Sequence, residues 1–283
     1  MRKGLLLILV IASQAALAQN NLQNYTPSIL FDKGDWEFKT FQNLYTQSKA
    51  FDASGGKRDL GRTETFFTSI NQFLYGLNEQ INVGFDVWYK ASNNTVDNFG
   101  ATGGISGFGP KIKIAPIKAL PRLSIQSTFL FNTLDDPEGS EGTRYFLEFD
   151  ANLWLNQIFF DLPLNEKSQL FFQQAFWFRT VRDSFVENNF LDTQTSVFYS
   201  YFPTSRWTLY AMSEFFPRHY NANEGAQEAS AFYEYFIQSG LGLKYQLIPN
   251  LIEVEALYTN FWNGSEGQGA GETINLGIRV IRQ

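Results

Sequence analysis

Thr63–Ala91 decides the fold, and it reads TETFFTSINQFLYGLNEQINVGFDVWYKA. Its second half alternates strictly between apolar and mostly polar residues. One face carries Ile81, Val83, Phe85, Val87 and Tyr89, and the other carries Asn82, Gly84, Asp86, Trp88 and Lys90. A period of two residues predicts a β-strand rather than a helix. Because polar residues 78–80 separate the two halves, the stretch predicts a long antiparallel hairpin.

The arms of this hairpin are long. Each has roughly ten residues or more, whereas strands of globular proteins usually have five or six. A tilted strand needs about nine to eleven residues to cross a bilayer. We therefore expect the apolar face to meet lipid and the polar face to line a lumen.

The N-terminus has the features of a secretory signal peptide. Two basic residues precede an apolar run at 5–11, and small residues follow as far as Ala18. This order predicts export and cleavage after Ala18, which removes residues 1–18. We expect residues 19–34 to form a periplasmic lead-in, as a short plug or an extended tail, and residues 35–283 to form the barrel.

The same alternating unit repeats to the end of the chain. Strands are predicted at 35–47, 63–77, 80–91, 107–115, 122–133, 143–160, 169–182, 190–202, 206–216, 231–245, 251–261 and 272–282. The gaps between them alternate between short and long, as in outer-membrane barrels with short periplasmic turns and long outer loops. An open sheet edge in lipid would leave backbone groups unpaired, so the predicted fold class is all-β, a closed antiparallel transmembrane β-barrel of about 12 strands.

The composition favours a membrane barrel over a soluble β-sandwich, which would alternate in the same way. Aromatic residues make up 17% of the chain, and a barrel can place them in girdles at the two membrane interfaces. The absence of cysteine excludes disulfides and thiolate metal sites. A net charge of −6 without a basic block gives no support to nucleic-acid binding. Neither a cofactor nor a metal is predicted, because the acidic stretch at 135–141 is typical of a solvated loop.

Charged and polar side chains keep to one parity along most of the predicted strands. An Arg or Lys that faces lipid near the midplane costs about 2–4 kcal/mol, so this parity predicts the lumen face. The candidate lumen and solute-contact residues are Asp86, Trp88, Lys90, Lys111, Lys113, Glu148, Asp150, Trp177, Arg179, Lys244, Glu253, Glu255 and Arg279. In the predicted strand 143–160, the same rule places Leu153 and Leu155 on the lipid face. The first two strands alternate less clearly, and their facing stays open.

Several turn segments resemble one family of bacterial outer-membrane barrels, named for the meta-pathway of phenol degradation. These segments are 75–84, 103–110, 199–210, 242–251 and 275–278. The resemblance spans most of the mature chain, and it implies an outer-membrane transporter or channel of a Gram-negative bacterium. It also implies passage of small, often hydrophobic, molecules and offers no catalytic residues. The chain departs from the family pattern at Pro110, where the family usually has an acidic residue, and at 131–133.

We expect the barrel to pass or bind small solutes, including hydrophobic or aromatic ones, with outer-membrane lipid as its surroundings. One alternative is a structural barrel whose lumen is plugged by the same side chains. Another is an outer-membrane lipid hydrolase, which needs an activated nucleophile such as a serine beside a histidine. The single histidine, His219, has no serine two residues away, so no enzyme activity is predicted. The identity of the solute and the oligomeric state stay open.

Overall fold

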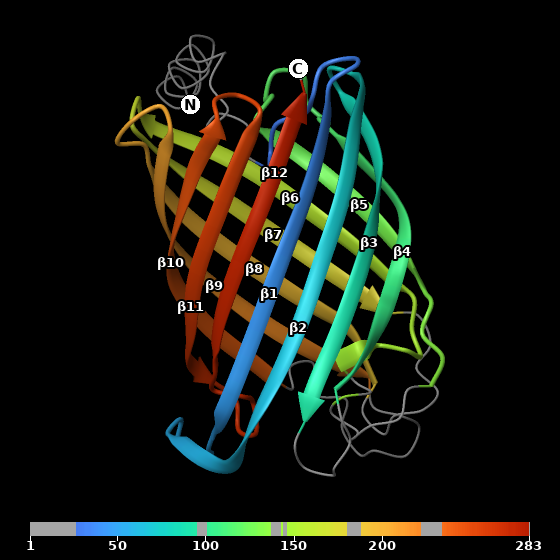
Figure 1. The fold of residues 1–283 in the computed structure, drawn as a ribbon, viewed down its shortest axis with the longest axis vertical. Coiled ribbons are helices and arrows are strands. Elements are labelled where there is room, and N and C mark those ends of the chain that lie inside the picture. The colour runs from blue at the N-terminus through green and yellow to red at the C-terminus, as the bar shows by residue number, and fades with distance from the viewer. Residues whose placement is uncertain are drawn as a thin grey trace, which may run out of the picture.

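The computed structural model describes residues 27–94, 101–136, 143, 146–179, 188–221 and 234–282. Within these residues the chain forms twelve antiparallel strands that close into a barrel (Figure 1), which confirms the predicted fold class. The strands are β1 (Trp36–Phe51), β2 (Lys57–Asn78), β3 (Ile81–Asn94), β4 (Thr102–Ile114), β5 (Leu123–Asn132), β6 (Leu153–Asn165), β7 (Ser168–Arg179), β8 (Asn188–Tyr201), β9 (Trp207–Asn221), β10 (Glu234–Ile248), β11 (Ile252–Gly264) and β12 (Glu272–Arg282). No described segment is a helix long and apolar enough to cross a membrane.

The barrel closes between its first and last strands. β1 pairs with β12 from Trp36 opposite Arg282 to Thr46 opposite Glu272. All other pairs join strands that are consecutive in the sequence. Closure leaves no sheet edge whose backbone N–H and C=O groups would remain unpaired in lipid.

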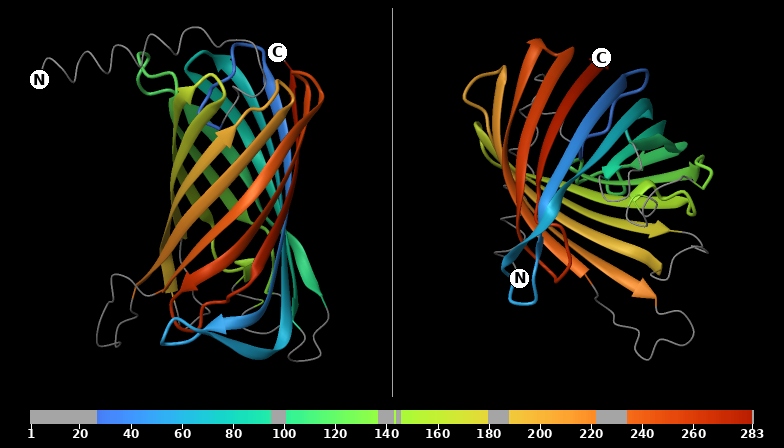
Figure 2. Two further views of the ribbon diagram at one scale, coloured as in Figure 1. Left: turned by 90° about the vertical axis from the view of Figure 1, so that its left-hand side faces the viewer. Right: turned by 60° about the horizontal axis from the view of Figure 1, so that its bottom comes forward.

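The two ends of the barrel differ. The start of β1 and the end of β12 lie at one end (Figures 1 and 2), together with short turns such as 79–80 and 166–167. We call this the short-turn end. The opposite end carries the turn at 52–56 and residues 265–271, which join β11 to β12, and we call it the long-loop end. An even number of strands places both strand termini at the same end.

The outer face of the barrel is largely apolar, and the inner face carries most of the charged side chains. Phe85, Leu241 and Leu276 are among the large apolar side chains exposed on the outside, and Leu241 reaches 73% exposure. Asp86, which follows Phe85 on β3, points inward and is 1% exposed. Exposed Trp207 and Trp262 lie near opposite ends of the outer surface, where aromatic girdles of membrane barrels occur. The outer face is therefore suited to hydrocarbon.

Polar residues on the outer face of β1 and β2 bond to one another. Thr40 Oγ1 donates to Asn71 Oδ1 at 2.8 Å, and Gln42 Nε2 donates to Thr40 Oγ1 at 2.8 Å. A polar group in hydrocarbon is costly when it has no partner. These bonds lower that cost and explain why the sequence of the first two strands alternates less clearly.

The predicted strand at 143–160 is wrong in its first half. β6 begins at Leu153, while residues 148–150 form a turn in which Glu148 has a φ of +54°. The alternation therefore does not continue from this segment into β6. Leu153 and Leu155 are buried in the lumen, and Trp154 is exposed on the outside, so the predicted lipid-facing position of the two leucines is also wrong.

The predicted signal peptide, residues 1–18, lies outside the described residues, as do residues 19–26 of the predicted lead-in. Residues 27–34 lie at the short-turn end against the inner surface of the barrel. Phe31 is buried there, where it packs against Leu74 of β2 and Ile281 of β12. We call residues 27–34 the N-terminal segment.

Candidate functional site

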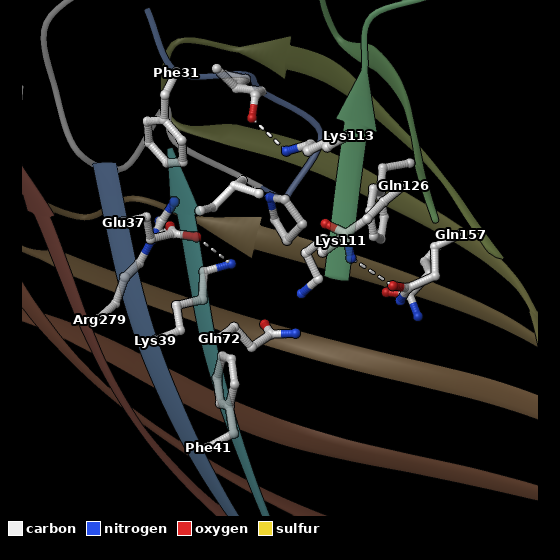
Figure 3. A pocket seen from close by; sticks show the side chains of 15 residues that line it. Phe31, Glu37, Lys39, Phe41, Gln72, Lys111, Lys113, Gln126, Gln157 and Arg279 are labelled. Atoms are coloured by element: carbon white, nitrogen blue, oxygen red, sulfur yellow. Dashed lines mark hydrogen bonds and ion pairs between the residues drawn. The ribbon is translucent and has the colours of Figure 1, made fainter. Parts of the chain in front are cut away.

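A cavity of about 200 Å³ lies in the lumen at the short-turn end (Figure 3). Among the described residues that line it, four cations accompany one carboxylate, Glu37. The cations are Lys39, Lys111, Lys113 and Arg279, and amides of Gln72, Gln126, Gln157 and Gln173 complete the polar lining. We call it the cationic cavity. Lys111 and Lys113 lie two residues apart on β4, so both face the lumen. Lys39 reaches the same cavity from β1.

Most of the charge in this cavity is paired. Lys111 Nζ lies 2.5 Å from Asp86 Oδ1, and both side chains are almost fully buried. Glu37 binds Lys39 Nζ at 3.0 Å and accepts a hydrogen bond from Arg279 Nε. Removing an ion from water costs several kcal/mol, and these pairs offset that cost.

Lys113 is held differently from the other cations. Its Nζ donates to the Ile29 carbonyl oxygen at 2.5 Å and lies 5.9 Å from the centre of the Phe159 ring. The residue is 3% exposed, and no carboxylate of the described residues forms a salt bridge with it. An ammonium group has three donors, so the carbonyl leaves donor capacity at this position.

The N-terminal segment forms one wall of the cationic cavity. Ser28 Oγ donates to Asp161 of β6, which also accepts from Gln169 Nε2 at 3.1 Å. Ile29 is tied to β4 through Lys113. Hydrogen bonds to two strands therefore fix this segment inside the lumen.

A second cavity of about 240 Å³ adjoins the first and shares Pro27, Phe41, Gln173 and Arg279 with it. Its apolar part includes Phe171, Phe198 and Tyr210, which continue a row of aromatic rings from Phe159 of the cationic cavity across four strands. Phe159, Phe171, Phe198 and Tyr210 follow one another with centroid distances of 5.9, 5.4 and 6.2 Å. We call it the ring-lined cavity.

The ring-lined cavity also has a charged side. Tyr210 O–H donates to Glu255 Oε1, and Lys244 Nζ lies 3.4 Å from Glu255 Oε2. Glu253 lies 3.9 Å from Arg279 Nη1, on the side shared with the cationic cavity. Apolar and charged surfaces thus meet within one space.

An apolar layer lies on one side of the lumen, on β2, β3 and β5–β7, near the middle of the barrel. Trp88, Leu130, Leu153, Leu155 and Ala175 form a buried cluster, and Ile70 and Trp177 pack against it. The indole rings of Trp88 and Trp177 pack edge to face, with their centroids 5.7 Å apart. On β3, Trp88 lies between Asp86 and Lys90, so on this side of the lumen the layer lies between the charges nearer the short-turn end and those nearer the long-loop end.

A third cavity of about 670 Å³ lies at the long-loop end. Glu148 lines this cavity. Its Oε2 lies 2.8 Å from Lys90 Nζ, and its Oε1 accepts a hydrogen bond from Arg179 Nε. Arg179 Nη1 in turn lies 2.7 Å from Asp192 Oδ2. The Phe146 carbonyl accepts a further hydrogen bond from Lys90. These contacts hold the segment before β6 against the lumen wall at this end of the barrel.

The predicted site residues are spread along the whole lumen. Lys111, Lys113 and Arg279 line the cationic cavity; Lys244, Glu253, Glu255 and again Arg279 line the ring-lined cavity; Lys90, Glu148, Trp177 and Arg179 line the third. Asp86 supports Lys111, Trp88 belongs to the apolar layer, and Asp150 lines none of these cavities. Glu37 and Lys39 were not among the predicted residues, although their spacing of two residues on β1 was a usable signal. Solute contact by any of these residues remains a prediction.

His219 lies on β9 next to the lumen-facing Arg218, so alternation points its side chain outward. Its Nε2 is 3.5 Å from Thr193 Oγ1. In the described part of the chain, no group of three or more His, Asp or Glu side chains is arranged to hold a metal ion.

Comparison with known proteins bears on the fold. No protein-family model matches the sequence, and no curated protein matches it. The structure is similar to an outer membrane channel from Pseudomonas putida F1, with a TM-score of 0.69 and 10% identity over 90% of this chain and 98% of that one. Weaker likenesses, too low to carry an argument, link it to the CymD monoaromatic hydrocarbon channel (TM-score 0.48, 10% identity, 89% of each chain) and the NanC porin (TM-score 0.49, 7% identity, 86% of this chain and 98% of that one). At these identities the likeness is one of fold alone, that of a closed antiparallel β-barrel.

Proposed function

We propose that this chain is an outer-membrane channel that passes small solutes, including hydrophobic or aromatic ones. The observation that carries the proposal is a barrel with an apolar outer belt around a lumen that holds successive cavities. The belt matches the hydrocarbon-facing surface of membrane barrels. The fold shared with a channel from Pseudomonas putida F1 supports the same function.

The finer parts of the proposal rest on the sequence. The turn segments that resemble the meta-pathway phenol-degradation family support membership of that family. The N-terminal pattern of residues 1–18 supports export through a cleaved signal peptide. Together they lead us to infer an outer-membrane location in a Gram-negative bacterium, and a protein without enzymatic activity.

The first test combines location with transport. The full-length protein should fractionate with the outer membrane, and the folded barrel should migrate faster on a gel before heating than after. In planar bilayers we expect small conductance with weak selectivity among inorganic ions, because most of the lumen charges are paired with charges of the opposite sign. Liposomes that contain the protein should take up a small aromatic alcohol faster than empty ones.

The alternatives have distinct outcomes in this test. A folded barrel that shows neither conductance nor uptake would be a plugged structural barrel. Lipid cleavage that disappears in His219→Ala would identify a hydrolase. Recovery of the protein in the soluble periplasmic fraction would contradict the membrane location altogether.

Glu148→Ala should increase single-channel conductance. Glu148 holds the segment before β6 against the wall through Lys90 and Arg179, and its positive φ costs about 1–3 kcal/mol that these pairs compensate. Without the carboxylate, the segment should leave the wall and open the long-loop end. Single-channel recording at fixed salt measures the change.

The matched control is Glu266→Ala, which removes an exposed carboxylate at the same end of the barrel. It should leave conductance unchanged. Equal conductance for Glu148→Ala and the wild type would show that this segment does not limit the current.

A further inference from the structure

We propose that the cationic and ring-lined cavities form one binding site for a small carboxylate with a compact, ring-sized apolar body. This inference deepens the proposed channel function and rests on it, because it names the class of solute that the channel selects. It would make the solute an anion with an apolar body rather than a neutral hydrocarbon.

The carboxylate end of the site is at Lys113. This ammonium group is buried and bonded to a backbone carbonyl, without a salt bridge to a carboxylate of the described residues. Lys39 and Lys111 reach the same space, as Figure 3 shows, and each already has one carboxylate partner. A buried ion without a counter-ion is energetically costly. A carboxylate in the cavity would supply that counter-ion.

Glutamine amides favour a carboxylate in the same place. Gln72, Gln126, Gln157 and Gln173 line the cavity from four strands, and an amide N–H is a donor for carboxylate oxygens. Gln126 Nε2 donates a hydrogen bond to Gln157 Oε1 at 2.8 Å, which orders this part of the wall. The lining therefore offers both charge and directed donors to an anion.

The apolar end of the site is the row of rings. It begins at Phe159, the ring beneath Lys113, and continues through Phe171 and Phe198 to Tyr210. Offset and edge-on packing against such rings favours a flat apolar body. Because the two cavities share Phe41 and Gln173, one molecule can place its carboxylate at Lys113 and its body along the rings.

The dimensions fit a small solute. Pockets for drug-sized ligands have volumes of about 300–1,000 Å³, and each of these two cavities is smaller, at about 200 and 240 Å³. Neither alone suits a large molecule. Together they have room for a solute with one ring and one acidic group.

Isothermal titration of the full barrel in detergent micelles tests the site, with benzoate, benzamide and acetate as probes. Benzamide keeps the ring without the charge, and acetate keeps the charge without the ring. We expect benzoate to bind about tenfold or more tightly than either, the factor that corresponds to a charge-assisted hydrogen bond. Lys113→Gln should lower the affinity for benzoate about tenfold and leave that for benzamide unchanged.

Two further variants guard against an effect on folding. Lys39→Gln should also reduce the ratio of benzoate to benzamide affinity, whereas Lys118→Gln, in the exposed turn after β4, should not. Equal binding of benzoate and benzamide by the wild type would overturn the proposal. A ratio unchanged in both Lys113→Gln and Lys39→Gln would overturn it as well.

Liposome uptake separates this inference from the channel function. Uptake of benzamide and benzoate at equal rates, without preferential binding of benzoate, would support the channel function and contradict the carboxylate site. Preferential benzoate binding by a barrel that passes no solute would support the carboxylate site and contradict the channel function.

Discussion

Asp86→Leu is expected to lower the free energy of unfolding of the barrel by about 3–5 kcal/mol, the usual cost of breaking a buried ion pair. Asp86 and Lys111 are almost fully buried and lie 2.5 Å apart, and Asp86 also accepts from Gln72 Nε2 at 3.0 Å. Removal of the carboxylate leaves the Lys111 charge in the lumen wall without its partner. Denaturant unfolding in lipid vesicles, followed by tryptophan fluorescence, measures the loss.

The double variant Asp86→Leu/Lys111→Met is the matched control. Replacement of a buried pair by apolar residues of similar volume is often neutral or stabilising. The double variant should therefore recover most of the stability that the single variant loses. A double variant as unstable as Asp86→Leu would mean that the carboxylate acts through Gln72 or through packing, and not through Lys111.

Leu276→Lys is expected to destabilise the inserted barrel by about 2–4 kcal/mol, the cost of a lysine that faces lipid near the midplane. Leu276 lies in the middle of β12 and is 54% exposed on the outer face. The ammonium group would have to remain in hydrocarbon or distort the bilayer around it. The fraction of heat-modifiable barrel after refolding into vesicles, at increasing urea, reports the change.

Asn275→Lys is the control on the same strand. Asn275 faces the ring-lined cavity and accepts from Asn43 Nδ2 at 2.6 Å, so the new charge would lie in a polar lumen. It should cost about 1 kcal/mol for the lost hydrogen bond. Similar losses at both positions would contradict the assignment of the outer face to lipid.

Much of the lumen facing could be predicted because lipid penalises charge strongly. Glu253 and Glu255 on β11, and Arg279 on β12, share the parity that points inward, as the alternation of their apolar neighbours indicated. The rule works where a regular strand crosses the bilayer, since each residue must then choose between hydrocarbon and the lumen.

The same rule failed where the chain leaves the regular strand. Residues 148–150 carry Glu148 and Asp150 at a spacing of two, yet they form a turn held by Lys90 and Arg179. Spacing in the sequence cannot distinguish a strand from a segment that folds against lumen charges. β1 gives a second example. Apolar Phe41 faces the lumen, and polar Thr40 faces outward with a hydrogen bond to Asn71, so apolar and polar residues do not alternate as the rule requires.

The N-terminal segment lacked any period from which its position could be derived. Phe31 is buried in the lumen because Leu74 and Ile281 provide an apolar site for it, and those residues are far away in the sequence. The cavities depend on such long-range contacts. Their lining charges could be found from the sequence, but their grouping into cavities could not.

The seam between β1 and β12 has a consequence for assembly in the membrane. Arg279 lies opposite Lys39 in the ladder and reaches diagonally to Glu37 across the seam. A slip of one residue would turn Arg279 from the lumen toward lipid. A register shifted by one residue is therefore strongly disfavoured, and the ion pair that completes the wall also favours the observed alignment. Closure of the barrel and alignment of its first and last strands thus depend on the same residues.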